Sequence, residues 1–219
     1  MKTNFKDDTK EAAITRFPSP IKDLPIPMSD EEKIAYIAER FREIMNVLGL
    51  DLEDESLSRT PYRVAKMYVK EIFSGLDINQ FPEISFMEDH YRINGKGNMV
   101  FVRVHFTSFC EHHFVPMSGV AYVAYLPKGK LIGLSKIPRI VKFFARRPQI
   151  QERLTVQIAD SLATLLETED VAVSITAEHF CVAARGIEDQ NGHTTTNTFR
   201  GQFDSVSSLR QEFFEAVNN

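Results

Sequence analysis

The sequence has no tryptophan and only two cysteines, Cys110 and Cys181, among its 219 residues. So few cysteines exclude a small scaffold held together by several disulfides. No stretch approaches the ~20 apolar residues that a helix needs to span a bilayer. Residues 1–20 carry charges and no apolar run typical of a signal peptide. We therefore expect a cytoplasmic protein without membrane contact, in which both thiols stay reduced.

Charge of neither sign dominates the composition. There are 26 lysines and arginines against 30 aspartates and glutamates, which gives a net charge of −4. This balance offers no global reason to expect nucleic-acid binding, so an anionic ligand has to be held by a local cluster of cations. The hydrophobic content of 43% suffices for a sizeable core.

The N-terminal part of the chain reads as an arm followed by helices. Residues 1–28 are polar and then punctuated by prolines, which indicates an extended, unpacked lead-in. A capping-box pattern, Ser29-Asp30-Glu31-Glu32, opens a helix that ends at Gly49. Thr60-Pro61, a hydroxyl N-cap before proline at the first helical position, opens a second helix that stops at Gly75.

The remainder of the chain mixes strands and helices. Segments rich in Val, Tyr and Phe, or alternating in polarity, predict strands over residues 99–106, 119–126, 171–179 and 195–203. A turn at Lys128-Gly129-Lys130 suggests a hairpin between the second of these strands and residues 131–134. Helices are expected over residues 135–147 and 149–166. The second of them is expected to face the core with four side chains: Leu154, Ile158, Leu162 and Leu165. Helices first, then an antiparallel sheet carrying helices, indicate an α+β fold.

The strongest chemical signal is Cys110-Glu111-His112-His113 together with Cys181. The spacing Cys-x-x-His brings a thiolate and an imidazole within reach of one ion, and Cys181 supplies a third soft ligand. Three protein ligands and an open position for water are typical of catalytic zinc, whereas structural zinc has four. In this interpretation His112 stays free for proton transfer. His179, two residues before Cys181 on the same strand face, lies near the ion.

Three alternatives stay open for these residues at this point. Buried, inert cysteines are common in cytosolic proteins. A fourth protein ligand, His112 or His179, would close a structural Cys2His2 site. His179 also fits the role of a hydrogen-bonded structural histidine.

Basic residues form a second signal. Ser135-Lys136-Ile137-Pro138-Arg139 opens a helix with two cations near its N-terminus, where the helix dipole disfavours them. Free N–H groups at that end bind anions, so the conflict makes sense if an anion lies there. Arg185, Arg63 and Lys66 add positive charge that suits a polyanion such as a triphosphate. The alternative is an ordinary solvated helix face.

A third signal is the start of the next helix, Gln149-Ile150-Gln151-Glu152-Arg153. A glutamate in a pocket accepts two hydrogen bonds from the N1–H and exocyclic amine of guanine, and the Gln151 amide can meet the guanine carbonyl. The alternative is a normal acidic first turn.

In this order, the segments resemble the GTP cyclohydrolase I family from about Asp30 to the C-terminus. The resemblance rests on motifs from five parts of the chain: Thr60-Pro61-x-Arg63-Val64-Ala65-Lys66-Met67, Ser108-x-Cys110-Glu111-His112-His113, Gly133-Leu134-Ser135-Lys136-Ile137-x-Arg139, Arg147-Pro148-Gln149-x-Gln151-Glu152-Arg153-Leu154-Thr155 and His179-x-Cys181-x-x-x-Arg185-Gly186. Arg103 and Met117-Ser118 depart from the usual family residues, and neither departure touches a proposed ligand.

The resemblance implies a T-fold, an antiparallel sheet with helices on one face, over residues 96–219. A helical region, residues 29–95, precedes this catalytic domain, and the arm, residues 1–28, lies outside the resemblance. It further implies a homodecamer around a sheet-lined tunnel, with active sites between subunits. The family converts GTP and water to 7,8-dihydroneopterin triphosphate and formate, the entry to folate and pterin synthesis.

The implied roles agree with the residue-level interpretation. Zinc on Cys110, His113 and Cys181 activates water for attack at C8 of guanine, while the other site residues handle protons and substrate. The proton carriers are His112 and His179, and Ser135 serves the ribose rearrangement. The substrate contacts are Gln151 and Glu152 on the base, Leu134 beside them, Lys136, Arg139 and Arg185 on the triphosphate, and Arg63 and Lys66 from a neighbouring subunit.

Other classes of protein predict different features. A binding protein with structural zinc needs a fourth protein ligand and releases no formate from GTP. Another T-fold enzyme acting on a purine or pterin, such as a nitrile reductase, needs a cysteine nucleophile without this metal triad. A zinc nucleobase deaminase needs His-x-Glu and Pro-Cys-x-x-Cys motifs, which are missing.

Overall fold

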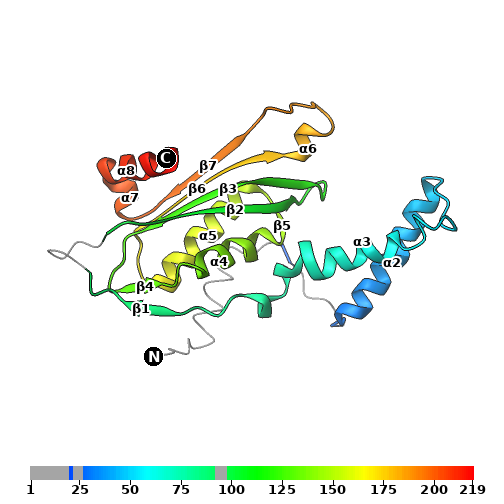
Figure 1. The fold of residues 1–219 in the computed structure, drawn as a ribbon, viewed down its shortest axis with the longest axis horizontal. Helices are drawn as coiled ribbons and strands as arrows, with labels where there is room; N and C mark the ends of the chain where they lie inside the picture. The colour runs from blue at the N-terminus through cyan, green and yellow to red at the C-terminus, as the bar shows by residue number, and fades with distance from the viewer. Residues whose placement is uncertain (1–19, 22–26, 92–97) are drawn as a thin grey trace.

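The computed structural model describes residues 20–21, 27–91 and 98–219 (Figure 1). The predicted arm, residues 1–28, lies almost wholly outside the described residues. Within the described part, no helix combines the length and apolar character that crossing a membrane requires.

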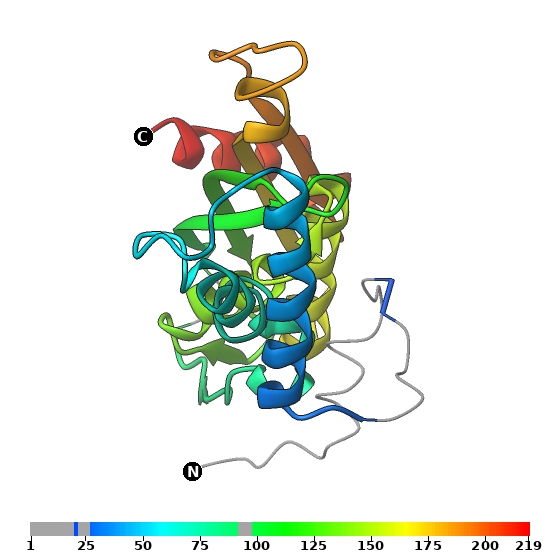
Figure 2. The ribbon, with the colours of Figure 1, turned by 90° about the vertical axis from the view of Figure 1, so that its right-hand side faces the viewer.

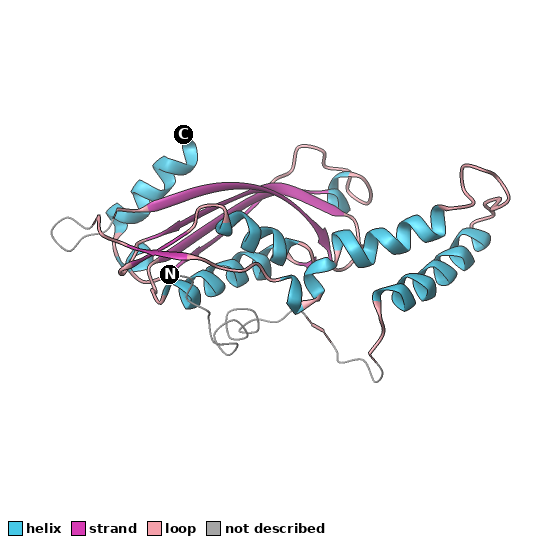
Figure 3. Cartoon of the chain, turned by 60° about the horizontal axis from the view of Figure 1, so that its bottom comes forward, coloured by secondary structure: helices cyan, strands magenta, loops and turns pink. Residues whose placement is uncertain are grey.

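A helical hairpin extends from one end of the molecule (Figure 3). Its first helix, α2 (Asp30–Val47), carries the predicted capping box: the Ser29 Oγ accepts from the Glu32 backbone N–H at 3.2 Å, and the Glu32 carboxylate accepts from the Ser29 N–H at 2.7 Å. The second helix, α3 (Thr60–Met67), packs along α2. The prediction that the Thr60 hydroxyl caps α3 is wrong, because Arg59 occupies the cap position and no side-chain cap bond forms.

The hairpin is attached to the body through a series of tight turns. A π-helical turn, Tyr68–Ile72, continues α3, and two 3-10 turns, Ser74–Leu76 and Ile78–Gln80, follow it. Gly75 lies in the first of these, where a Cβ atom would come within 2.1 Å of the Phe143 carbonyl oxygen. Only glycine allows the backbone to approach this closely.

The main sheet has the strand order β5-β2-β3-β6-β7. Strands β2 (Val100–Cys110), β3 (Pro116–Tyr125), β6 (Val171–His179) and β7 (Thr194–Phe199) are antiparallel neighbours, which confirms the four predicted strands. The short β5 (Pro148–Gln149) pairs parallel to the end of β2.

The predicted hairpin between β3 and residues 131–134 does not form. Strand β4 (Lys130–Ile132) instead pairs with β1 (Phe86–Glu88) in a separate two-stranded sheet. The reason is that β3 already has β2 on one side and β6 on the other, so it has no free edge. Because β1 belongs to the region predicted to be helical, this small sheet connects that region to the rest of the fold.

Helices α4 (Lys136–Ala145) and α5 (Gln151–Leu166) cover one face of the main sheet (Figure 1). The core lies between these helices and the sheet. It includes the four predicted side chains of α5, all 0–1% exposed: Leu154, Ile158, Leu162 and Leu165. The predicted α+β fold, with its antiparallel sheet and covering helices, is thus confirmed.

Two C-terminal helices, α7 (Gln202–Ser205) and α8 (Ser207–Asn218), were not predicted. They pack on the opposite face of the sheet, at one end (Figure 1), where Phe203 and Phe213 form a second cluster with Ala124 and Ala172. These alanines alternate with the first-core residues of the same strands, so β3 and β6 are buried on both faces here.

Candidate metal centre and active site

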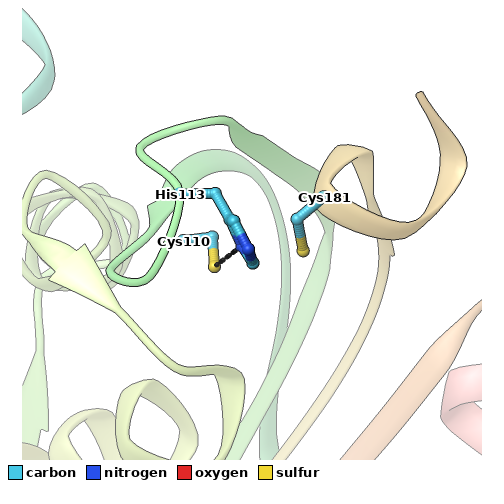
Figure 4. A group of neighbouring side chains, drawn as sticks. All are labelled: Cys110, His113 and Cys181. Atoms are coloured by element: carbon cyan, nitrogen blue, oxygen red, sulfur yellow. Dashed lines mark hydrogen bonds between the residues drawn. The ribbon is translucent and has the colours of Figure 1, made fainter. Parts of the chain in front are cut away.

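Three metal-ligand side chains come together at one end of the sheet (Figure 4). Cys110 is the last residue of β2, His113 lies in the β2–β3 loop, and Cys181 lies in the short helix α6 (Phe180–Ala183) after β6. Strand β3 lies between β2 and β6, and it pairs Phe109 with Pro116 and Met117 with His179. This register aligns the strand ends, so the ligand atoms of the three side chains all lie within 4.8 Å of one another.

The loop that carries His113 is held by its own backbone. The Cys110 N–H donates to the Val115 carbonyl at 2.9 Å, and the Phe114 N–H donates to the Cys110 carbonyl at 2.9 Å. Phe114 adopts a left-handed conformation with φ of 55°, which is unusual for an aromatic residue. Its ring packs against those of Phe73 and Tyr68, at centroid distances of 5.0 and 6.1 Å. Packing against the helical hairpin therefore compensates for the backbone strain.

Glu111 ties the same loop to helix α5. Its carboxylate accepts two hydrogen bonds from the Arg153 guanidinium, at 2.5 and 3.0 Å, and its N–H donates to the Gln149 carbonyl at 3.0 Å. The hydrogen bond from Arg153 is the main reason that the pKa of Glu111 lies below its usual value. A bidentate arginine–carboxylate pair fixes both position and orientation.

The donor chemistry of the three side chains fits a zinc ion. Both cysteines are free thiols, and the Cys110 Sγ lies 3.8 Å from the His113 Nδ1. Burial and the neighbouring Cys110 raise the pKa of the Cys181 thiol. A divalent cation between the sulfurs would reverse this effect, because it favours the thiolate form.

The described residues contribute three members to this metal-capable group, and neither His112 nor His179 is among them. His112 is 65% exposed; its Nδ1 lies 3.9 Å from the Cys110 Sγ and its Nε2 3.9 Å from Glu111. His179 is half-buried, and its Nε2 lies 2.7 Å from the Gln151 Oε1. Burial lowers the pKa of His179, while the nearby Glu152 carboxylate opposes that effect. Neither histidine is therefore part of the group that could hold a metal ion.

The predicted anion-binding residues lie on helices α3 and α4, at the start of α4, and in the loop after α6. Ser135 occupies the N-cap position of α4 but makes no side-chain cap bond, and Leu134 before it is 65% exposed. Lys136 and Arg139 follow in the first turns of α4, and Arg63 and Lys66 lie exposed on α3. Within the described ranges, none of these four cations forms an ion pair: Lys136, Arg139, Arg63 and Lys66.

Arg185 is the one predicted triphosphate contact that reaches the metal group. Its guanidinium donates to the His113 Nε2 at 3.1 Å. The other ring nitrogen of His113, Nδ1, faces Cys110. Ligation of a metal by Nδ1 keeps the ring hydrogen on Nε2, which can then no longer accept from Arg185. Metal binding would thus free the Arg185 guanidinium to bind an anion.

Gln151 and Glu152 have different surroundings at the start of α5. Glu152 is exposed, whereas Gln151 is buried and its amide nitrogen has three acceptors within the chain. Both amide hydrogens are therefore engaged, which disfavours the predicted contact between this amide and a guanine carbonyl. The Glu152 contact with guanine stays a prediction.

Comparison with known proteins decides the family. The sequence profile of the GTP cyclohydrolase I family matches residues 37–218, which include every site residue described above. The chain belongs to the GTP cyclohydrolase I family. The resemblance inferred from the motifs is thereby confirmed.

Several bacterial members of the GTP cyclohydrolase I family are similar over nearly their whole length, and each is named GTP cyclohydrolase 1. The protein of Aeromonas salmonicida is 50% identical over 211 residues, covering 94% of this chain and 95% of its own. That of Erwinia tasmaniensis is 52% identical over 202 residues, covering 92% and 88%. That of Citrobacter koseri is 51% identical over 211 residues, covering 95% and 94%.

Sequence reasoning missed three supports of the site: the pair Glu111–Arg153, the ring contacts of Phe114, and the hydrogen bonds of Gln151. Glu111, Arg153 and Gln151 all lie inside motifs that carry the family resemblance. A glutamate and an arginine in two such motifs offered a signal for an ion pair. Nothing in the local sequence indicates which rings Phe114 meets.

Proposed function

We propose that this chain hydrolyses GTP to 7,8-dihydroneopterin triphosphate and formate, with zinc as its cofactor. The observation that carries the proposal is the three-membered group Cys110, His113 and Cys181 in a chain of the GTP cyclohydrolase I family. Two thiolates and an imidazole suit zinc, and three protein ligands leave one position for water. The reaction takes place in the cytoplasm, and its product serves tetrahydrofolate or other pterin synthesis.

Zinc bound by these three residues would supply Lewis acidity, which lowers the pKa of water enough to provide hydroxide near neutral pH. The protein then has to deliver protons to the guanine ring. His112 is exposed next to the ligands and donates a proton to N7 when C8 is attacked. His179, whose ring contacts Gln151, carries a proton in the second hydrolysis, which releases formate.

Substrate recognition is divided between base, ribose and phosphates. Glu152 accepts hydrogen bonds from the N1–H and amine of guanine, which distinguishes GTP from ATP. Ser135 assists the ribose rearrangement and Leu134 packs beside the substrate. The triphosphate is held by basic side chains without carboxylate partners in the described chain: Lys136, Arg139, Arg63 and Lys66, with Arg185 added once the metal is bound.

The active form is a homo-oligomer, a decamer, with sites between subunits. The unpaired edges of the sheet support this assembly. In the described sheet, β7 has no partner on its outer side and β2 is paired there only through Phe109 and Cys110. Unpaired strand edges favour pairing with another chain.

A binding protein with structural zinc is the less favoured alternative. It requires a fourth protein ligand, and the metal-capable group in the described chain has three members. Family membership also points away from it, since the similar proteins are named as cyclohydrolases.

The first test measures zinc content and formate release together. The purified protein should bind zinc and release formate from GTP, and a chelator should abolish turnover until zinc is restored. Cys110→Ser and Cys181→Ser should lose both zinc and turnover, because each removes a soft ligand. Full activity in a zinc-free variant would contradict the proposal. Zinc binding without formate release would favour a binding protein with structural zinc.

A further inference from the structure

The side chain of Gln151 lies at the centre of a closed hydrogen-bond network beneath the active site. It is the first residue of α5 and is 1% exposed. Its Nε2 lies 3.0 Å from the Ile175 carbonyl oxygen, 2.9 Å from that of Thr194 and 3.1 Å from the Thr196 hydroxyl. Its Oε1 lies 2.7 Å from the Nε2 of His179. Gln151 thus joins β6, β7 and the proposed proton carrier.

The orientation of this amide follows from the chemistry of its partners. Backbone carbonyls only accept hydrogen bonds, so the NH2 group of Gln151 has to face Ile175 and Thr194. A flipped amide would place its oxygen against two carbonyl oxygens at a buried position, with no hydrogen between them. The amide oxygen is therefore directed at His179.

Two hydroxyl groups reinforce that orientation. The Thr155 hydroxyl donates to the Gln151 carbonyl at 2.8 Å, so it has no hydrogen left for Thr196, 2.6 Å away. The Thr196 hydroxyl has to donate to Thr155 and is then free to accept from the Gln151 amide. The NH2 group of Gln151 shares its two hydrogens among three acceptors, and each hydroxyl donates only once.

We propose that Gln151 is a positioning residue, which holds His179 in the tautomer with its hydrogen on Nε2 and a free lone pair on Nδ1. An amide oxygen cannot donate, so the Nε2 at 2.7 Å has to carry the hydrogen. His179 then exchanges protons with substrate through Nδ1 alone. The catalytic part of this statement rests on the proposed function, whereas the tautomer itself does not.

The tautomer is testable by magic-angle-spinning NMR of the zinc-loaded oligomer labelled with ¹⁵N-histidine, with the His179 signal assigned from a His179→Asn sample. We expect hydrogen on Nε2 and none on Nδ1 in the wild type. In Gln151→Met, which keeps the length but removes the acceptor, we expect a mixture of tautomers. The control, Gln157→Met, replaces another buried glutamine of α5, whose Oε1 accepts a hydrogen bond from the Gln149 amide, and should leave the signal unchanged.

Kinetics separate positioning from base recognition. In Gln151→Met, kcat should fall about tenfold or more with KM for GTP nearly unchanged, because a proton carrier contributes to the transition state. A KM that rises while kcat is kept would overturn the proposal in favour of a guanine contact. So would a wild-type His179 with hydrogen on Nδ1, a result that needs no folded variant. If the wild type releases no formate from GTP, the proposed function fails while the tautomer result still decides the positioning role.

Discussion

At the scale of single residues, neighbours in sequence have separate tasks. Cys110 is buried and ends a strand, Glu111 is paired with Arg153, and His112 projects into solvent. Three consecutive side chains therefore differ in exposure and partners, which suits one to bind metal, one to brace the loop and one to move a proton. The proposed chemistry depends on keeping these tasks apart.

Replacement of His112 tests whether it moves a proton or binds the metal. His112→Ser should keep zinc but lower kcat by about 10²–10⁴-fold, the usual contribution of a general acid. Zinc content by atomic absorption and formate release measure the two effects. His90→Ser, at another exposed histidine, should behave as wild type. Loss of zinc in His112→Ser would show that His112 is a fourth ligand.

Replacement of Glu152 tests recognition of the base. In Glu152→Gln one of the two charge-assisted hydrogen bonds to guanine is lost, worth about 1.5–3 kcal/mol, so KM for GTP should rise roughly 10- to 150-fold. Competition between GTP and ATP measures the selection directly. Glu212→Gln, at an exposed position on α8, is the matched control. Unchanged discrimination against ATP would remove Glu152 from base recognition.

At the scale of elements, the helical hairpin is attached to the body at Gly75 by a close approach of two backbone segments. The Gly75 N–H donates to the Arg146 carbonyl at 2.9 Å, and its own carbonyl accepts from the Arg147 Nε at 2.7 Å. Arg147 is 3% exposed, and burial lowers its pKa to about 10. Its guanidinium also lies 4.6 Å from the Phe143 ring centroid. These contacts fix the end of the hairpin against α4, next to the rings that support the metal-binding loop.

The substitution Gly75→Ala should therefore loosen the hairpin. Its Cβ would lie 2.1 Å from the Phe143 carbonyl oxygen and 2.8 Å from that of Arg146. Since backbone has to shift, we expect a loss of about 3 kcal/mol in the free energy of unfolding, measured by urea titration. The control Gly49→Ala meets no atom within 4 Å but has φ of 77°, and should cost only about 1–2 kcal/mol. Equal losses in both would contradict a close approach at Gly75.

At the scale of the whole molecule, the described chain leaves both the sheet edges and the basic residues of α3 without partners. The hairpin that carries Arg63 and Lys66 extends beyond the body of the fold in Figure 3, and in Figure 2 it faces the viewer. Cations on an extended element are well placed to reach a neighbouring subunit. The shape of the single chain therefore supports the proposed shared site.

Complementation tests the shared site. Lys66→Gln and Glu152→Gln should each be poorly active alone. When the two are co-expressed, mixed oligomers should recover roughly a quarter of wild-type activity, because native copies of both residues meet at some interfaces. Cys110→Ser co-expressed with Glu152→Gln should recover nothing, since both residues serve the site within one chain. Light scattering gives the mass of the assembly. An active monomer would contradict the proposed shared site.

The sequence by itself determined the local elements and the chemistry. The capping box at Ser29 and the four core side chains of α5 follow from hydrogen bonds and periodicity that involve near neighbours. Likewise, the Cys-x-x-His spacing and the second cysteine were sufficient to predict three side chains that the fold brings together and that could hold a metal ion. Properties that depend on residues a few positions apart are visible in a linear string.

Only the tertiary structure decided which distant segments meet. It paired β4 with β1 because β3 had no free edge, and it placed α8 on the second face of the sheet. It also changed the interpretation of Gln151 from a base contact to the partner of His179. These outcomes depend on competition among remote partners for the same edge, face or hydrogen bond. No local pattern records that competition, because its result is settled only when the whole chain packs.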